Sequence, residues 1–189
     1  PVSPQSMTPT SANPPILHHF ETSPFSEKLR AILGYKGLAW RSVQVPMAMP
    51  KPDVVALTGG YRKTPILQIG ADIYADTALI AQVLEALQPA PTLYPASAAM
   101  APAAAAWADA VLFWQAIMNT QAPEARATLF KHLSAEEIRT LSADRVAFAA
   151  AVRRPTVADA QAQFQTALQM FERALAHGPW LMGAEASIA

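Results

Sequence analysis

Ile16-Leu-His-His-Phe-Glu-Thr-Ser-Pro-Phe-Ser-Glu-Lys-Leu-Arg30 is the stretch that decides the fold of this 189-residue chain. Its apolar and aromatic start at 16–20 is bounded by proline and by a turn, which predicts a short buried strand. A helix follows, because Ser23 fits the N-cap and Pro24 fits the first helical position. Apolar residues then recur at helical spacing, as Phe25, Leu29, Ile32 and Leu33. The stretch therefore predicts a strand, a turn and an amphipathic helix in direct succession.

The alternation of strands and helices continues as far as Pro89. Gly37 is the expected stop of the first helix, and Gly70-Ala71 is a two-residue hairpin signal. The remaining expected elements are a strand at 40–45, a short helix near 54–57, strands at 65–69 and 72–75, and a helix at 79–87. The order β-α-β-α-β-β-α predicts an α/β domain of thioredoxin-like topology at 16–88.

The second half of the chain is rich in alanine and shows helical spacing alone, so we predict an all-α bundle at 98–189. A linker at 89–97 is expected to separate it from the first domain. Ser134 and Glu137 fit a capping box. The residues that define the expected apolar stripes are Met100, Trp107, Val111, Trp114 and Met118, and then Val157, Phe164, Leu168, Phe171 and Leu175 behind the cap Thr156. Residues 1–15, with five prolines, are expected to form a disordered tail.

Composition narrows the classes of function. Fourteen basic residues balance fourteen acidic ones, so a nucleic-acid partner or an anionic membrane partner is not expected. There are no cysteines, which excludes disulfides, thiolate metal sites and any mechanism that uses a thiol of the protein itself. Without an apolar run long enough to span a bilayer, we expect a cytoplasmic protein.

Three motifs in this order resemble a known family. The stretch at 16–30 resembles the first strand, active-site turn and first helix of a glutathione S-transferase. Lys63-Thr-Pro-Ile-Leu67 resembles the cis-proline segment of that family, and Asp76-Thr77 holds the place of its acidic-hydroxyl pair. The resemblance implies a protein that uses glutathione as co-substrate.

By this resemblance, Ser23 occupies the position of the catalytic serine or cysteine. A thiol with a pKa of roughly 8.5 is mostly protonated at neutral pH, and the thiolate is the nucleophile. A hydroxyl that donates to the sulfur, aided by the helix dipole, lowers that pKa. Two alternatives stay open: Ser23 is only an N-cap, or Ser26 contacts the sulfur, although its hydroxyl is expected to face the helix backbone.

The resemblance also implies where the rest of glutathione would lie. Pro65 is expected to follow a cis bond that turns the backbone of Thr64 toward the peptide. Thr77 and the helix behind it suit the γ-glutamyl carboxylate, and Asp76 suits the ammonium group. Phe25 is a further expected contact. Lys51, Arg62 and Lys63 are candidates for the glycyl carboxylate, although each is more often a solvated charge.

His18 and His19 are expected on opposite faces of one strand, which argues against a shared metal. Candidates for an apolar second-substrate pocket are Trp107, Phe113, Trp114, Ile117 and Met118. The bundle is expected to be incomplete at its C-terminus, where Pro179–Ala189 resembles the approach to a capping motif.

We therefore expect a homodimeric detoxification enzyme that conjugates glutathione to an apolar electrophile. A non-catalytic binding or regulatory module and a glutathione-dependent isomerase or dehalogenase are the alternatives.

Overall fold

The computed structural model of the chain describes residues 13–121, 123–131, 133–149 and 155–189. It divides into two compact units, Pro1–Thr92 and Leu93–Ala189. The division falls within the segment expected to link the domains. The tail expected at 1–15 lies mostly outside the described residues.

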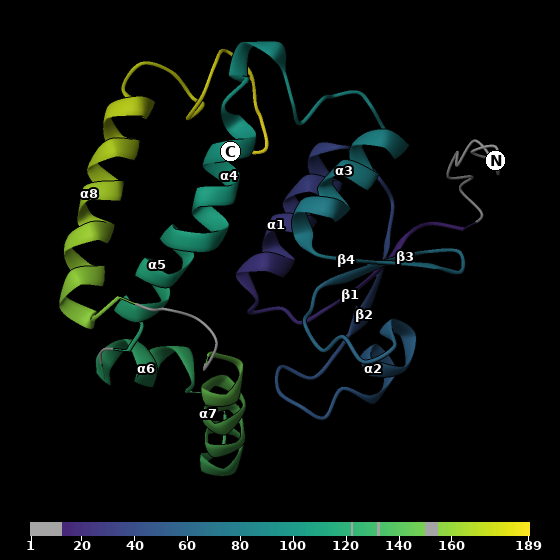
Figure 1. Cartoon of the computed structure of the whole chain (residues 1–189), viewed down its shortest axis with the longest axis vertical. Helices are drawn as coiled ribbons and strands as arrows, with labels where there is room; N and C mark the ends of the chain where they lie inside the picture. Colours follow the sequence, from purple (N-terminus) through teal and green to yellow (C-terminus); the bar gives the residue numbers. More distant parts are fainter. Residues whose placement is uncertain (1–12, 122, 132, 150–154) are drawn as a thin grey trace. The chain divides into compact units, whose positions relative to one another are not determined.

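The first unit is built on a four-stranded mixed sheet of order β2-β1-β3-β4. Strand β1 is parallel to β2 and antiparallel to β3, and β3 and β4 form a hairpin. Figure 1 shows α1 and α3 on one side of the sheet and α2 on the other. In chain order the elements are β1 (Ile16–His19), α1 (Pro24–Tyr35), β2 (Arg41–Gln44), α2 (Pro52–Thr58), β3 (Ile66–Ile69), β4 (Asp72–Ala75) and α3 (Thr77–Leu87). The predicted βαβαββα order is confirmed.

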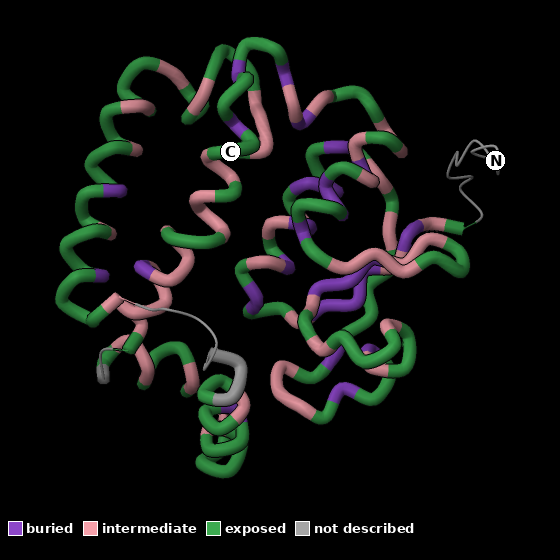
Figure 2. The backbone as a smooth tube through the Cα atoms, in the orientation of Figure 1, coloured by how far each residue is buried: buried purple, intermediate pink, exposed green. Residues whose placement is uncertain are grey.

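Apolar burial explains why two helices lie on one face of the sheet. The central strands β1 and β3 and the inner sides of α1 and α3 form the main core, where Figure 2 gathers most of the buried positions. The fully buried side chains of this core are Leu17, Leu29, Leu33, Leu67, Ile80 and Leu84. A smaller cluster on α2's side joins Val45, Val54 and Ile66. Each buried leucine or isoleucine contributes about 1.5–3 kcal/mol.

Glycine stops α1 as expected. Gly37 has a φ of 63°, a left-handed conformation that favours glycine. Its N–H donates to Gly34 at 3.0 Å, and that of Leu38 donates to Leu33 at 3.0 Å. These two bonds form a Schellman motif. The hairpin signal is also confirmed, because Gly70 has a φ of 62° and Ile69 pairs directly with Asp72.

A buried lysine ties the end of α1 to the end of α3. The Lys36 side chain is fully buried, and its Nζ pairs with the Glu85 carboxylate. It also donates to the carbonyl oxygens of Gln88 at 2.8 Å and Pro91 at 2.6 Å. These contacts satisfy the charge and fix one helix against the other.

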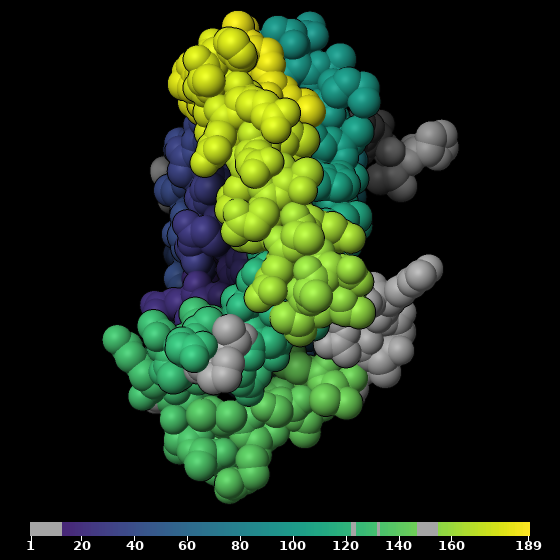
Figure 3. Space-filling view, turned by 90° about the vertical axis from the view of Figure 1, so that its left-hand side faces the viewer, coloured from purple at the N-terminus to yellow at the C-terminus, as the bar shows by residue number. Residues whose placement is uncertain are grey.

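The second unit is helical in every described element. Helix α5 packs against α8, and Trp107 at the end of α4 meets Phe171 of α8 edge-on, with 6.4 Å between ring centroids. In Figure 3 α8 runs down the face toward the viewer. The elements of the second unit are the 3₁₀ helix η1 (Ala96–Ala98), α4 (Ala101–Trp107), the π-helical segment η2 (Ala108–Leu112), α5 (Phe113–Asn119), α6 (Pro123–Leu129), α7 (Ala135–Ala149) and α8 (Val157–Leu175). The predicted all-α second half is confirmed.

The apolar stripe expected along α4 and α5 is partly wrong. Met100 is 66% exposed and Val111 is 41% exposed, whereas Trp107, Trp114 and Met118 are half-buried. The π-helical segment η2 lies inside this stretch. Met100 is the N-cap of α4, so it lies outside the helical repeat. Val111 lies within η2, where the wider π-helical turn departs from a regular 3.6 period.

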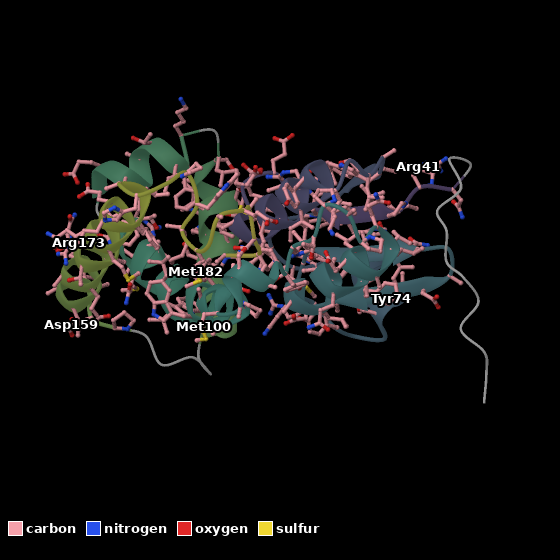
Figure 4. All side chains as sticks on the ribbon, turned by 90° about the horizontal axis from the view of Figure 1, so that it is seen from above. Arg41, Tyr74, Met100, Asp159, Arg173 and Met182 are labelled. Atoms are coloured by element: carbon pink, nitrogen blue, oxygen red, sulfur yellow. The ribbon has the colours of Figure 1, made fainter. Side chains whose placement is uncertain are left out.

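Polar residues cap the ends of the later helices. The expected capping box before α7 is present: the N–H of Glu137 donates to Ser134 Oγ at 3.2 Å, and the N–H of Ser134 donates to Glu137 Oε2 at 2.8 Å. Thr156 caps α8, which carries Asp159 in its first turn and Arg173 in its last, both labelled in Figure 4. These signs complement the helix dipole. In the described part of the chain, no helix is long and apolar enough to cross a membrane.

Candidate functional site

Three segments far apart in sequence meet at one end of the sheet. The end of β1 lies beside the start of β3, since His18 pairs with Ile66. The end of β4 lies there too, because Ala75 pairs with the same Ile66. Ser23 follows β1, Thr64-Pro65 precedes β3, and Asp76-Thr77 follows β4. The register of the sheet thus brings the three motif segments to the same end of the sheet.

Ser23 is the N-cap of α1 and is only 4% exposed. Its Oγ accepts the N–H of Ser26 at 3.2 Å, and its own N–H donates to Phe20 at 3.3 Å. Among the residues that the structure describes, no acceptor takes the hydroxyl proton of Ser23. The cap therefore uses a lone pair of this hydroxyl and leaves its proton available for a hydrogen bond.

Ser26 departs from expectation. Its side chain is fully buried, but Oγ makes no hydrogen bond to the helix backbone or to any other described group. It also takes the inner place that the spacing predicted for Phe25, which is half-buried. The buried face of α1 consists of Ser26, Leu29, Ile32 and Leu33. Packing against the sheet and α3 sets this rotation, so the first turn of the helix is not centred on Phe25.

Lys51 lies beside the segment that precedes β3. It is only 5% exposed, and its Nζ donates to Thr64 Oγ1 at 3.0 Å. The same Nζ lies 5.3 Å from the centroid of the Phe20 ring. The peptide bond between Thr64 and Pro65 is cis, as predicted. Lys51 is thus a buried cation rather than a solvated one, whereas Arg62 is half-buried and Lys63 is exposed.

Asp76 has an unusual backbone conformation. Its φ is 78°, the only positive φ outside glycine in the described chain. Its Oδ1 caps α3 by accepting the N–H groups of Ala78 at 2.8 Å and Leu79 at 3.3 Å. Such strain costs about 1–3 kcal/mol and is concentrated at functional sites. The exposed Asp76 and the buried Thr77 together place a carboxylate and a hydroxyl at a helix N-terminus.

Tyr61, in the loop after α2, lies close enough to Asp76 to interact with it electrostatically. In the structure, burial raises its pKa, and the negative charge of Asp76 raises it further. The loop after α2 therefore brings a phenol into the field of Asp76. No spacing rule connects residues 61 and 76, so only the folded loop could reveal this neighbour.

The two histidines of β1 point to opposite faces, as expected from alternation along a strand. His18 Nε2 lies 3.0 Å from Gln68 Oε1 on β3. His19 contacts Arg30 on α1 instead, with Nδ1 at 2.9 Å from Nη1. Burial lowers the pKa of His19, and the Arg30 charge lowers it further. Within the described chain, no group of three metal-ligating side chains occurs.

The candidates for the apolar pocket are all half-buried. Trp107 contacts Phe171, which supports a packing role for it, and the rings of Phe113 and Trp114 meet edge-on at 5.1 Å. The candidates lie on α4 and α5 of the second unit. Partial exposure leaves each of them able to contact a small apolar molecule.

Comparison with known proteins shows which family the chain resembles. Residues 17–92 match the family model of the glutathione S-transferase N-terminal domain. A glutathione S-transferase-like protein from Pseudomonas syringae is 41% identical, with a TM-score of 0.55, over 88% of this chain and 61% of that one. The chain thus spans less than two thirds of that relative. No curated protein sequence gives a significant match.

More distant structures share the fold. The β-etherase LigF from Sphingobium sp. strain SYK-6 is 18% identical, with a TM-score of 0.67, over 92% of this chain and 78% of that one. A glutathione S-transferase from Methylobacterium radiotolerans, in complex with glutathione sulfonate, is 21% identical with a TM-score of 0.55, over 92% and 73%. At these identities the likeness establishes the fold alone.

Proposed function

We propose that this chain, which belongs to the glutathione S-transferase family through its domain at residues 17–92, binds glutathione and ionises the glutathione thiol at Ser23. The observation that carries the proposal is the Ser23 hydroxyl, whose proton has no acceptor in the described chain while its oxygen caps α1. A sulfur atom placed there would accept that proton as a hydrogen bond.

The expected gain follows from acid–base chemistry. A thiol of pKa roughly 8.5 is only a few per cent ionised at pH 7. A hydrogen bond to the thiolate is charge-assisted, and the N-terminus of α1 adds a positive dipole end. One pKa unit corresponds to about 1.4 kcal/mol, which these two effects supply together. Ser23 would thereby raise the thiolate fraction about tenfold.

Groups that could bind the charged ends of glutathione lie at the same end of the sheet. Lys51 is a buried cation beside Thr64 and suits the glycyl carboxylate. Asp76 suits the γ-glutamyl ammonium group, while Thr77 and the N-terminus of α3 suit the α-carboxylate. The backbone of Thr64, just ahead of β3, would pair with the extended peptide as an added strand does. Phe25 would contact the peptide from the first turn of α1.

The chemistry we propose is conjugation to a small apolar electrophile. The thiolate sulfur forms a bond to an electrophilic carbon, and the leaving group departs with the electron pair of the bond that breaks. The second substrate would be an apolar molecule by family likeness. By family likeness the working protein would be a cytoplasmic homodimer that acts in detoxification, or a related isomerase or dehalogenase that uses the same thiolate.

One observation favours a second candidate. Ser23 is nearly buried and accepts a helix amide, so a role as helix cap alone accounts for its presence. The chain would then be a non-catalytic module that binds glutathione without ionising it. This candidate predicts normal binding with an unshifted thiol pKa.

Calorimetry of glutathione binding, combined with ultraviolet thiolate absorbance across pH, tests the proposal. We expect the wild type to bind and to hold a larger fraction of the thiol ionised at neutral pH than free glutathione does, and Ser23→Ala to bind with the thiol pKa raised by about one unit. Ser134→Ala, a serine cap remote in sequence from the site, is the matched control and should leave the thiol pKa unchanged. Equal thiol pKa values in wild type and Ser23→Ala would refute the role of Ser23, a wild-type thiol pKa equal to that of free glutathione would establish the module, and no binding at millimolar glutathione would refute both.

A further inference from the structure

The guanidinium of Arg30 joins three separate segments around Ser23. Its Nη1 lies 2.9 Å from His19 Nδ1 at the end of β1, and its Nη2 donates to the carbonyl oxygen of Glu21 at 2.8 Å. Its Nε donates to Glu27 Oε2, also at 2.8 Å, in the first turn of α1. One side chain thus connects a strand end, a loop and a helix start.

The loop between β1 and α1 is the segment that carries Ser23. Glu21 and Thr22 in this loop are exposed. The Ser23 N–H bond to Phe20 is long, at 3.3 Å. Because few other contacts hold these residues, the bond from Arg30 to the Glu21 carbonyl restrains the backbone two residues before Ser23. The direction of the Ser23 hydroxyl depends on this backbone.

The histidine contact fixes the other side of the guanidinium. An arginine has donors only, so His19 Nδ1 must be the acceptor and its Nε2 carries the proton. That Nε2 lies 2.8 Å from Ser42 Oγ on β2, and the ring meets Trp40 edge-on at 5.6 Å. The imidazole is therefore oriented by contacts at both nitrogens and by the Trp40 ring, and it presents a fixed lone pair to Arg30.

The ion pair with Glu27 does not account for this arrangement. Glu27 is 68% exposed, and exposed pairs at this spacing contribute little to stability. Arg139 and Glu136 form an ion pair of the same spacing on α7. Such a pair therefore does not require contacts to the loop that precedes the helix. The bonds to Glu21 and His19 are what distinguish Arg30.

We propose that Arg30 is a positioning residue, which holds the loop at Glu21 against β1 so that the Ser23 hydroxyl points to the glutathione sulfur. The inference rests on the proposed function of Ser23. Arg30 itself need not touch the ligand. Its loss should therefore alter the ionisation of bound thiol far more than the affinity for the peptide.

Two substitutions at Arg30 test the role. Arg30→Gln removes the charge and the fork, and Arg30→Lys keeps the charge and the apolar stem that supports folding. In both we expect the pKa of the bound thiol to rise by about one unit, with glutathione affinity changed less than about threefold. The controls are Arg139→Gln, which removes the equivalent ion pair on α7, and Glu27→Gln, which leaves the Glu21 bond in place; both should keep the wild-type thiol pKa.

Two substitutions at His19, one that keeps a hydrogen-bond acceptor and one that removes it, test the contact with Arg30. His19→Asn retains an acceptor oxygen near the place of Nδ1, and His19→Leu removes it. We expect the bound thiol pKa to stay near wild type in His19→Asn and to rise in His19→Leu. This split would not arise from a general loss of stability.

The outcomes distinguish the positioning role of Arg30 from the proposed role of Ser23. If Ser23→Ala raises the thiol pKa but Arg30→Gln and Arg30→Lys do not, positioning by Arg30 is overturned and the proposed function stands. If Ser23→Ala has no effect, both fail. If the Arg30 variants lose affinity in proportion to their change in thiol pKa, Arg30 is a ligand contact rather than a positioning residue.

Discussion

The N-termini of α1 and α7 are both capped by a serine, and they differ in whether the hydroxyl proton of that serine is donated. Ser134, exposed before α7, accepts the N–H of Glu137 and donates its own proton to the Glu137 carboxylate at 2.7 Å. Ser23, buried before α1, accepts the N–H of Ser26 and donates to no described group. The third residue of the helix makes the difference, because a glutamate there takes the hydroxyl proton and a serine does not.

Helix α8 repeats the α7 arrangement. Thr156 accepts the N–H of Asp159 at 3.1 Å and donates to Asp159 Oδ2 at 2.7 Å. Both of these caps are exposed and internally satisfied. Such caps contribute to helix stability alone. A buried cap with an unused proton is instead suited to a ligand.

The largest effect that would sharpen this contrast is expected from Ser23→Asp. Aspartate is as good a cap as serine, although burial at this position adds a desolvation cost for its charge. An ionised aspartate has no proton to donate to the thiolate, and its negative charge opposes ionisation of the thiol. We expect the bound thiol pKa to rise by about two units. Absorbance titration of bound glutathione measures this, and an unchanged value would remove the functional distinction between the two caps.

Stability should separate the caps next. Ser23→Ala leaves the Ser26 N–H without a partner where water does not reach, which costs about 2 kcal/mol. Ser134→Ala exposes the Glu137 N–H to water, so its cost is about 0.5–1 kcal/mol. Urea unfolding monitored by circular dichroism compares the two variants. Equal losses would mean that the α1 terminus opens to solvent as readily as that of α7.

A pH effect is expected at α1, through His19. Its pKa in the folded protein lies below 6.5 because of burial and the Arg30 charge. As the pH falls below 6.5, the unfolded chain binds a proton at this histidine that the folded chain resists, so stability is full above that pH and declines below it. Urea unfolding at about pH 7 and about pH 5.5 should show a smaller decline in His19→Asn than in wild type. Parallel declines would exclude His19 as the source.

The smallest effect is expected from Ser26→Ala. The substitution removes a buried hydroxyl that has no partner and introduces a stronger helix former, so stability should rise by about 0.5 kcal/mol. The bound thiol pKa should not change, since Ser26 contributes its N–H rather than its hydroxyl to Ser23. A raised thiol pKa would make Ser26 the group that contacts sulfur.

Local signals were sufficient for most elements of the fold. Gly37 and Gly70 were predictable as stops and turns because their backbone conformations are open mainly to glycine. The capping box at Ser134 and Glu137 was predictable because its contacts span only three residues. The exposure of Met100 and Val111 was not, since Met100 caps α4 from outside the helix and Val111 lies in the π-helical segment η2.

The candidate site was predictable only in part. Ser23, Pro65 and Asp76 stood out because each belongs to a motif with a recognisable neighbour. Lys51 was expected as one of three interchangeable cations, and its burial beside Thr64 distinguishes it. Tyr61 and the Arg30 network had no local signal.

The sequence by itself determined the order of strands and helices, the caps and the stops, because these depend on contacts within a few residues. Tertiary structure alone decided which side of α1 is buried, that Ser26 lies inside in place of Phe25, and that Arg30 reaches back to Glu21 and His19. These features depend on how α1 packs against the sheet. Packing is a property of residues distant in sequence, and no local period records it.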